Sequence, residues 1–96
     1  MTPALLYEPT WYVYLVHCAD NTYYCGISKD VDRRIHEHNL SRRGSKYTRA
    51  RRPVKLVWKS PPKTHKEAAQ MEYKIKKLSR RQKEIIIVTN NISLIK

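Results

Sequence analysis

Two short segments rich in aromatic and β-branched residues, separated by a run of turn formers, constrain this chain most. Residues 11–17 and 23–27 both have the composition of β-strands. Residues 19–22, which lie between them, are Ala, Asp, Asn and Thr and are typical of a turn. We therefore predict a β-hairpin, against which the rest of the chain must pack.

The middle of the chain contains one clear helix and one clear strand. Asp30 is a suitable N-cap for a helix from Val31 to about Asn39. A basic stretch follows at 41–52 and is either a loop or one short helical turn. Residues 54–58 then have the composition of a third strand.

The last third of the chain contains two helix starts of the same kind. Thr64 and Glu67 form a capping box, which predicts a helix to about Leu78. Ser79 begins a second box of this pattern, so a last helix should run through 85–88. The order is β-β-α-β-α-α, and the fold class is α+β, a three-stranded antiparallel sheet flanked by helices. With 96 residues we expect one domain, with a lead-in at 1–10 and a C-terminal helix or tail at 84–96.

The charge balance indicates the kind of partner. Twenty Lys and Arg face eight Asp and Glu, which gives a net charge of +12. A small domain this basic repels itself unless a polyanion is near, and a nucleic-acid backbone is the commonest such partner. The alternative is a basic protein whose charge serves solubility or a ribosome-like surface.

No segment of the sequence predicts secretion or membrane insertion. The longest aliphatic run is residues 85–88, far short of the roughly 20 apolar residues that span a bilayer. The N-terminus lacks the pattern of a signal peptide. Two cysteines, Cys18 and Cys25, are too few for a disulfide scaffold. We expect a cytoplasmic protein with no membrane partner.

Glu72 lies on the apolar face of the helix predicted at 64–78, between Ala68 and Ile75. A carboxylate in that position must be paired, protonated or bound to a metal. The two interpretations are a buried salt bridge to an arginine and a functional acid.

Arg34 and His38 are four residues apart and project from one side of the helix predicted at 31–39. Arginine can clamp a phosphate, and histidine can accept a proton. The alternative is a solvated helix edge.

The predicted hairpin is rich in tyrosine, in a chain with seven Tyr and no Phe. Choosing Tyr over Phe keeps a hydroxyl within reach of water or substrate. Tyr14 and Tyr24 fall on the same face of the sheet only if the connection has three or five residues, or if a bulge intervenes. Gly26 within a strand marks a bulge or a close backbone approach.

These residues, in this order, resemble the GIY-YIG nuclease domain over about residues 10–83. Residues 12–14 correspond to the GIY element and residues 24–26 to the YIG element. Arg34 corresponds to the arginine of the following helix, and Glu72 to the metal-binding glutamate. Residues 17–28 and 46–58 are most similar to the small stand-alone members of the family.

The sequence departs from the family pattern in four places. Tyr12 replaces the first Gly of GIY, and Cys25 replaces the Ile of YIG. Ile27 stands where some DNA-repair members carry a lysine near the phosphate. Longer members also carry an asparagine near the end of the domain, and we assign it to neither Asn90 nor Asn91.

The resemblance implies an Mg²⁺- or Mn²⁺-dependent endonuclease or phosphodiesterase that acts on DNA, or on RNA. Glu72 would hold one weakly bound ion, and Arg34 would contact the scissile phosphate. Tyr14 or His38 would activate the attacking water, and Tyr24 would position it. No second DNA-binding domain fits in 96 residues, so a separate protein could target the cleavage.

The basic stretch is the expected contact with the nucleic-acid backbone. Its candidate residues are Arg42, Arg43, Lys46, Tyr47, Arg49, Arg51 and Arg52. Contacts of this kind should be largely blind to sequence and should weaken steeply with salt. They also support the alternative function, a binding module with the same fold and no turnover.

Overall fold

The computed structural model describes residues 8–41 and 43–95. Their helices and strands follow the predicted order with two additions, a short helix in the basic stretch and a 3₁₀ helix near the C-terminal end. In chain order they are β1 (Tyr12–His17), β2 (Tyr23–Ser28), α2 (Val31–Leu40), α3 (Lys46–Arg49), β3 (Lys55–Lys59), α4 (His65–Lys76), α5 (Arg80–Thr89) and the 3₁₀ helix η1 (Ile92–Ile95). The α+β class is confirmed, and the basic stretch, left open between loop and helical turn, contains the four-residue helix α3.

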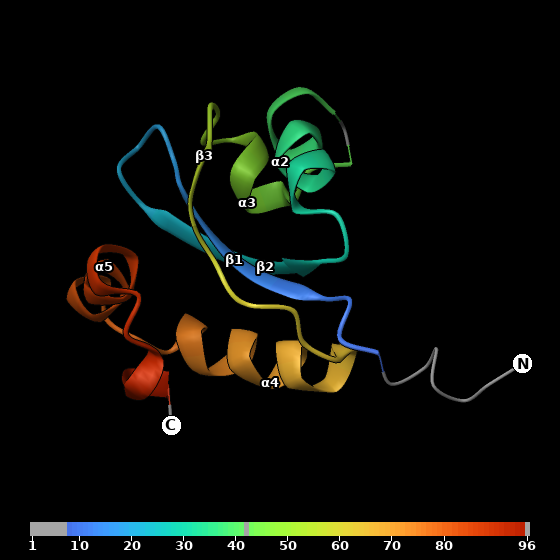
Figure 1. The fold of residues 1–96 in the computed structure, drawn as a ribbon. Helices are drawn as coiled ribbons and strands as arrows, with labels where there is room; N and C mark the ends of the chain where they lie inside the picture. The colour runs from blue at the N-terminus through green and yellow to red at the C-terminus, as the bar shows by residue number, and fades with distance from the viewer. Residues whose placement is uncertain (1–7, 42, 96) are drawn as a thin grey trace, which may run out of the picture.

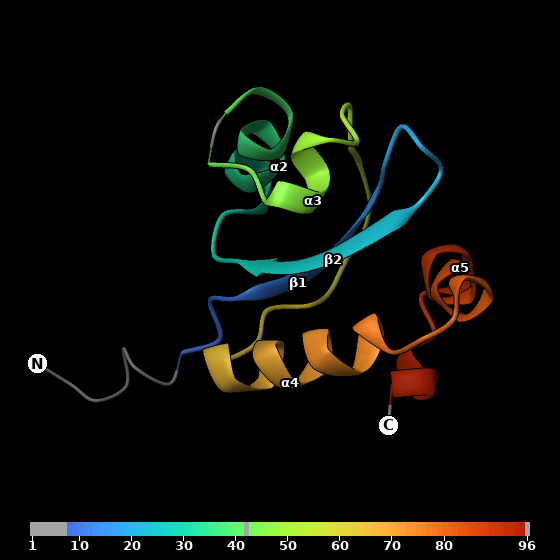
Figure 2. The same cartoon turned by 180° about the vertical axis from the view of Figure 1, so that it is seen from behind.

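The sheet is antiparallel with strand order β2-β1-β3, so β1 is central and β2 is an edge strand. Helices α2 and α3 lie on one side of it, and α4 lies on the other (Figure 1). Seen from behind, α5 stands beside the end of α4 and leads to the C-terminal helical turn (Figure 2). No helix within the described ranges is both long and apolar enough to cross a bilayer.

Each face of β1 contributes to a different core cluster, which is why four consecutive residues, 13–16, are buried. Val13 and Leu15 pack with Ala68 and Ile75 of α4 in the first cluster. Tyr14 and Val16 face the α2 side and belong to the second cluster. A strand covered on both faces has a nearly continuous apolar sequence, as the segment 11–17 does.

The hairpin connection has the odd length that the site requires. Residues 18–22 join β1 to β2, and Asn21 adopts a left-handed conformation with φ of 69°. The resulting register pairs Val16 with Tyr24 and Tyr14 with Gly26. Tyr14 and Tyr24 therefore lie on the same face of the sheet, as the active-site interpretation needs.

Local capping fixes where the helices begin, and three predicted caps are confirmed. The Asp30 side chain accepts a hydrogen bond from the backbone N–H of Arg33 at the start of α2. Thr64 and Ser79 both form complete capping boxes, at α4 and α5. Asn90 ends α5 in a left-handed conformation, and its side-chain oxygen accepts a hydrogen bond from the Trp58 indole at 2.8 Å.

Candidate active site

Tyr14 lies across Gly26 of the neighbouring strand. A Cβ atom on Gly26 would be 2.4 Å from the Tyr14 hydroxyl oxygen and 2.6 Å from the Cζ atom that carries it. No real Cβ atom approaches a neighbour so closely, so only glycine fits beneath this ring. The predicted close backbone approach at Gly26 is confirmed, and its cause is the position of the tyrosine hydroxyl.

His38 holds that hydroxyl from the other side. The His38 Nε2 atom is 2.7 Å from the Tyr14 hydroxyl oxygen. Its Nδ1 atom is 2.7 Å from the Thr48 hydroxyl oxygen and accepts the backbone N–H of Ser45 at 3.3 Å. His38 and Thr48 are completely buried, so the alternative of a solvated helix edge is wrong for His38.

Burial sets the protonation of this pair. It lowers the pKa of His38 to about 4, and the Arg34 guanidinium adds to that effect. It raises the pKa of the Tyr14 phenol, as the nearby Tyr24 also does, while Arg34 acts in the opposite direction. Near neutral pH His38 is therefore an uncharged imidazole beside a protonated phenol.

Arg34 lies at the edge of this group, partly exposed. Its Nη1 atom donates to the Glu37 carboxylate at 2.9 Å and to the Arg43 carbonyl at 2.7 Å. Glu37 in turn has its pKa lowered, chiefly by that hydrogen bond. Arg34 also lines a hollow of about 180 Å³ at the start of α2, together with Ser28, Lys29, Asp30, Arg33 and Glu37. A phosphate that enters this hollow meets the guanidinium next to Tyr14.

Tyr24 is held by a column of stacked side chains. Its ring stacks on Tyr47 with 5.6 Å between centroids and meets His38 edge-on at 5.4 Å. The Arg51 guanidinium covers the other face of Tyr47 at 3.8 Å and pairs with Asp20 of the hairpin connection at 2.8 Å. The column fixes Tyr24 beside His38 and links β2 to α3 and the hairpin loop.

Glu72 lies on α4, on the opposite side of the sheet from α2 (Figure 1), and its link to Tyr24 is through Lys76. Its carboxylate pairs with Lys76 at 3.2 Å, and the Lys76 ammonium lies 5.8 Å from the centroid of the Tyr24 ring. Burial first, and then the Glu72 charge, raise the pKa of the Cys25 thiol in β2 to about 12. Glu72 thus lies near strand β2, and its partner is a neighbouring lysine rather than a buried arginine. A salt bridge is present, as one of the two interpretations expected, but its cation is Lys76 instead of an arginine and the pair is partly exposed.

The donor set around Glu72 fits only a sparsely liganded cation. Within residues 8–41 and 43–95, no three His, Cys, Asp or Glu side chains converge as a metal cage. Mg²⁺ retains several waters and is commonly held by one or two carboxylates plus substrate phosphates. The Glu72 side chain, 23% exposed, could serve as one such ligand once Lys76 moves aside.

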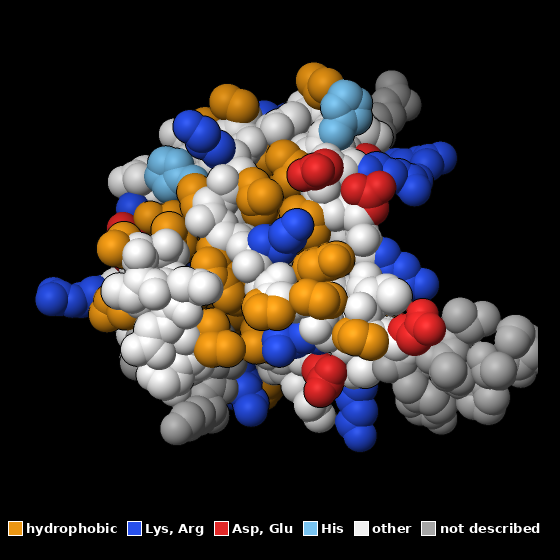
Figure 3. Space-filling model, viewed as in Figure 1, with side chains coloured by type: hydrophobic (Ala, Val, Ile, Leu, Met, Phe, Trp, Pro, Cys, Tyr) orange, Lys and Arg blue, Asp and Glu red, His pale blue; other side chains and the backbone are white. Residues whose placement is uncertain are grey.

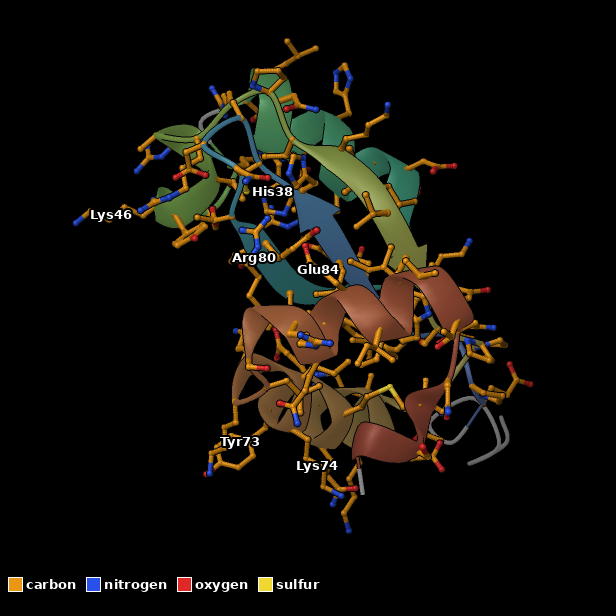
Figure 4. The ribbon with its side chains drawn as sticks, turned by 90° about the vertical axis from the view of Figure 1, so that its left-hand side faces the viewer. His38, Lys46, Tyr73, Lys74, Arg80 and Glu84 are labelled. Carbon is orange, nitrogen blue, oxygen red and sulfur yellow. The ribbon has the colours of Figure 1, made fainter. Side chains whose placement is uncertain are left out.

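The residues of the basic stretch divide into an exposed and an engaged group. Arg43, Lys46 and Arg49 are exposed, and Tyr47 is 36% exposed. Lys46 projects from α3 away from the body of the domain, whereas His38 lies inside it (Figure 4). The Arg52 guanidinium instead donates to the carbonyls of His38, Glu37 and Ser41 and caps the end of α2. Arg42 lies outside the described residues.

Two residues of this site were not identified from the sequence. Thr48 and Lys76 touch His38 and Glu72, respectively. The helical spacing of four between Glu72 and Lys76 is a signal that could have paired them. Nothing local in the sequence indicates that Thr48 is buried against His38, ten residues away.

Comparison with known proteins identifies the family of this chain. A model of the GIY-YIG catalytic domain matches residues 10–85. A UPF0213 protein of Desulfotalea psychrophila is 48% identical over 80 residues, which cover 83% of this chain and 73% of that relative. The UPF0213 protein YazA of Bacillus subtilis is 43% identical over 76 residues, covering 79% and 76%.

One solved structure is also similar. The solution NMR structure of a UPF0213 protein from Bacillus halodurans has 48% sequence identity and a TM-score of 0.47, and the match covers 81% of this chain and 82% of that one.

Proposed function

This chain belongs to the GIY-YIG catalytic domain family, among the small UPF0213 proteins, and from this premise we propose that it is a metal-dependent endonuclease that hydrolyses DNA. The observation that supports the proposal is the direct contact of Tyr14 with His38, beside Arg34 and Tyr24. Buried tyrosine and histidine bonded to each other, next to a partly exposed arginine, form a setting for proton transfer at a phosphate.

In the proposed hydrolysis, a specific side chain or water molecule carries out each step. Arg34 binds an oxygen of the scissile phosphate and offsets the charge that develops on it. Tyr14, as its phenolate, takes one proton from the attacking water, whose oxygen bonds to phosphorus while the bond to the leaving oxygen breaks. Because the resting phenol is protonated, its proton must pass to bulk water before each turnover, a step that the Arg34 guanidinium favours since it lowers the pKa of Tyr14. The leaving oxygen gains a proton from water.

The choice between Tyr14 and His38 as the base follows from their contacts. Both side chains are almost completely buried, but both ring nitrogens of His38 are bonded to protein atoms, whereas the Tyr14 hydroxyl has His38 on one side and lies beside Arg34, the group that would hold the phosphate. His38 is therefore a positioning residue that acts through Tyr14. Tyr24, fixed by Tyr47, orients the substrate on the same face of the sheet.

GIY-YIG nucleases typically use a divalent metal, and Glu72 is the side chain that would hold it here. When bound, Mg²⁺ or Mn²⁺ supplies positive charge to stabilise the leaving oxygen. Lys76 would release the Glu72 carboxylate for this purpose and remain near the phosphate as a second cation.

We propose that exposed basic side chains hold the nucleic-acid backbone, with Arg43, Lys46 and Arg49 nearest to the site. Lys and Arg occur around the whole outline of the domain in Figure 3, rather than in one compact patch. Such a distribution favours binding that is blind to sequence. The choice of target would then depend on DNA or RNA structure or on a targeting protein. We also propose that the protein is cytoplasmic, because Cys18 and Cys25 are free thiols and a reducing compartment keeps thiols in that state.

The test is Glu72→Gln, which removes the charge of the proposed ligand but keeps its shape. We expect nicking of supercoiled plasmid in Mg²⁺ or Mn²⁺ to fall by about 100-fold or more, with DNA affinity equal or higher. Glu84→Gln on α5 is the matched control for lost charge and should nick normally. Nicking by Glu72→Gln at the wild-type rate would overturn the assignment.

The second candidate function is a nucleic-acid-binding module without turnover. The exposed cations Arg43, Lys46 and Arg49 favour it, since they can hold a backbone without any catalytic group. Salt-sensitive DNA binding by the wild-type protein, with no cleavage in either metal, would establish this alternative.

A further inference from the structure

The proton on the His38 ring can be placed from the atoms around Nδ1. The backbone N–H of Ser45 points at Nδ1 from 3.3 Å, and a backbone N–H can only donate. A proton on Nδ1 would bring two donors face to face. The neutral imidazole therefore carries its proton on Nε2, the atom 2.7 Å from the Tyr14 hydroxyl oxygen, and the phenolic proton of Tyr14 points away from the ring.

Hydroxyl groups of α3 complete the same arrangement. The Thr48 hydroxyl oxygen is 2.7 Å from His38 Nδ1, 2.9 Å from the Ser45 hydroxyl oxygen and 3.1 Å from the Ser45 carbonyl. The Thr48 hydroxyl has one proton and cannot serve two acceptors, so with Nδ1 unprotonated that proton goes to the nitrogen at 2.7 Å and not to the Ser45 carbonyl at 3.1 Å. The Ser45 hydroxyl then donates to Thr48 and accepts the backbone N–H of Thr48 as the helix cap.

The charges around the ring keep it neutral. Arg34 and Glu37 lie on its own helix, and the Arg52 guanidinium lies against its backbone carbonyl. Tyr14 and Tyr24 approach from the sheet. Two cations against one carboxylate, together with complete burial, disfavour an imidazolium here, so the question at neutral pH is only which nitrogen carries the proton.

We propose that Ser45 and Thr48 hold His38 in the Nε2-protonated tautomer, so that His38 donates a hydrogen bond to Tyr14 rather than accepting its proton. Thr48 is thereby a positioning residue. The position of the proton on His38 is inferred from these contacts and does not depend on any activity. Its effect on catalysis rests on the proposed nuclease function. A hydrogen bond donated to the Tyr14 oxygen favours the phenolate, which is the form that removes a proton from water.

The first measurement needs no activity. Two-bond ¹H–¹⁵N correlation spectra of the ¹⁵N-labelled wild-type chain at pH 7 show which His38 nitrogen is protonated. We expect Nε2. A proton on Nδ1 would overturn the proposal whether or not the protein cleaves DNA, and it needs no variant that might fail to fold.

The second measurement uses Thr48→Val, which keeps the shape of the side chain but removes its hydroxyl. The variant loses the 2.7 Å bond to Nδ1 and keeps only the longer 3.3 Å bond from the Ser45 N–H, so we expect part of the His38 population to be protonated on Nδ1. Nicking should then be about tenfold slower, and its rise with pH should shift to more alkaline values, because the Tyr14 phenolate receives a weaker hydrogen bond. Thr48→Ser, which restores a hydroxyl, should rescue both. Thr89→Val on α5 is the matched control and should resemble wild type. A wild-type tautomer and pH profile in Thr48→Val would overturn the role of Thr48.

Discussion

Acid should destabilise this domain through His38 before its carboxylates are protonated. In the unfolded chain a histidine binds a proton with a pKa near 6.5. In the folded domain burial lowers the pKa of His38 to about 4, so the native state cannot take up that proton until the solution is far more acidic. Stability is therefore full above pH 6.5, falls as the pH drops through this interval, and levels off below about 4.

The magnitude follows from the width of the interval. Each pH unit between the two pKa values removes about 1.4 kcal/mol from the free energy of unfolding, so the whole effect is about 3 kcal/mol. A small domain has about 5–15 kcal/mol in all, so the loss is a large share. Carboxyls such as Glu37, whose pKa the Arg34 hydrogen bond lowers, contribute their own loss only at lower pH.

Urea unfolding at pH 7, 6, 5 and 4.5 measures this slope directly. His38→Gln keeps an amide that can donate to Tyr14 but cannot titrate, so its stability should be nearly flat across the interval. His36→Gln changes an exposed histidine of the same helix and should retain the wild-type slope. If His38→Gln loses stability with acid as steeply as wild type does, the buried neutral histidine is not the cause.

Three further substitutions test single contacts. Gly26→Ala adds a Cβ atom that displaces the Tyr14 ring, so the free energy of unfolding measured by urea titration should fall by about 1–3 kcal/mol. An unchanged urea midpoint would contradict the close approach of the ring to Gly26. Arg52→Met leaves carbonyls at the end of α2 without their donor and should cost about 2–3 kcal/mol, with thermal melting as the assay and a wild-type melting temperature as the contrary result. Lys76→Met releases Glu72, so Mn²⁺ affinity measured by calorimetry should rise several-fold; weaker binding would show that Lys76 does not compete with the metal.

Those parts of the fold that depend on neighbouring residues were predictable. The capping box at Thr64 begins α4 where the sequence places it, because all of its hydrogen bonds lie within four residues. The common face of Tyr14 and Tyr24 depends only on the parity of the hairpin connection. The resemblance to the GIY-YIG family, which the family comparison confirms, added candidate roles that local patterns alone could not assign.

The parts that depend on packing were not predictable. His38 is polar and sits on a helix rich in charged residues, and only the docking of α3, with Thr48, buries it. Arg52 looks like its exposed neighbour Arg49 in the sequence, yet it turns inward because the end of α2 lies beside it. Glu72 meets Lys76 rather than an arginine, since the burial expected for its helix face is incomplete at the edge of the sheet.

The division of the core into two clusters has a consequence for how the site is assembled. Tyr14 and its partners belong to the cluster on the α2 side, whereas the helix that carries Glu72 is anchored in the other through Ala68 and Ile75. A local opening that detaches α4 would remove the proposed metal ligand while leaving the tyrosine–histidine pair in place. The complete site thus exists only in molecules where two separate docking equilibria are satisfied together, and a modest weakening of either one would reduce the competent fraction without unfolding the protein.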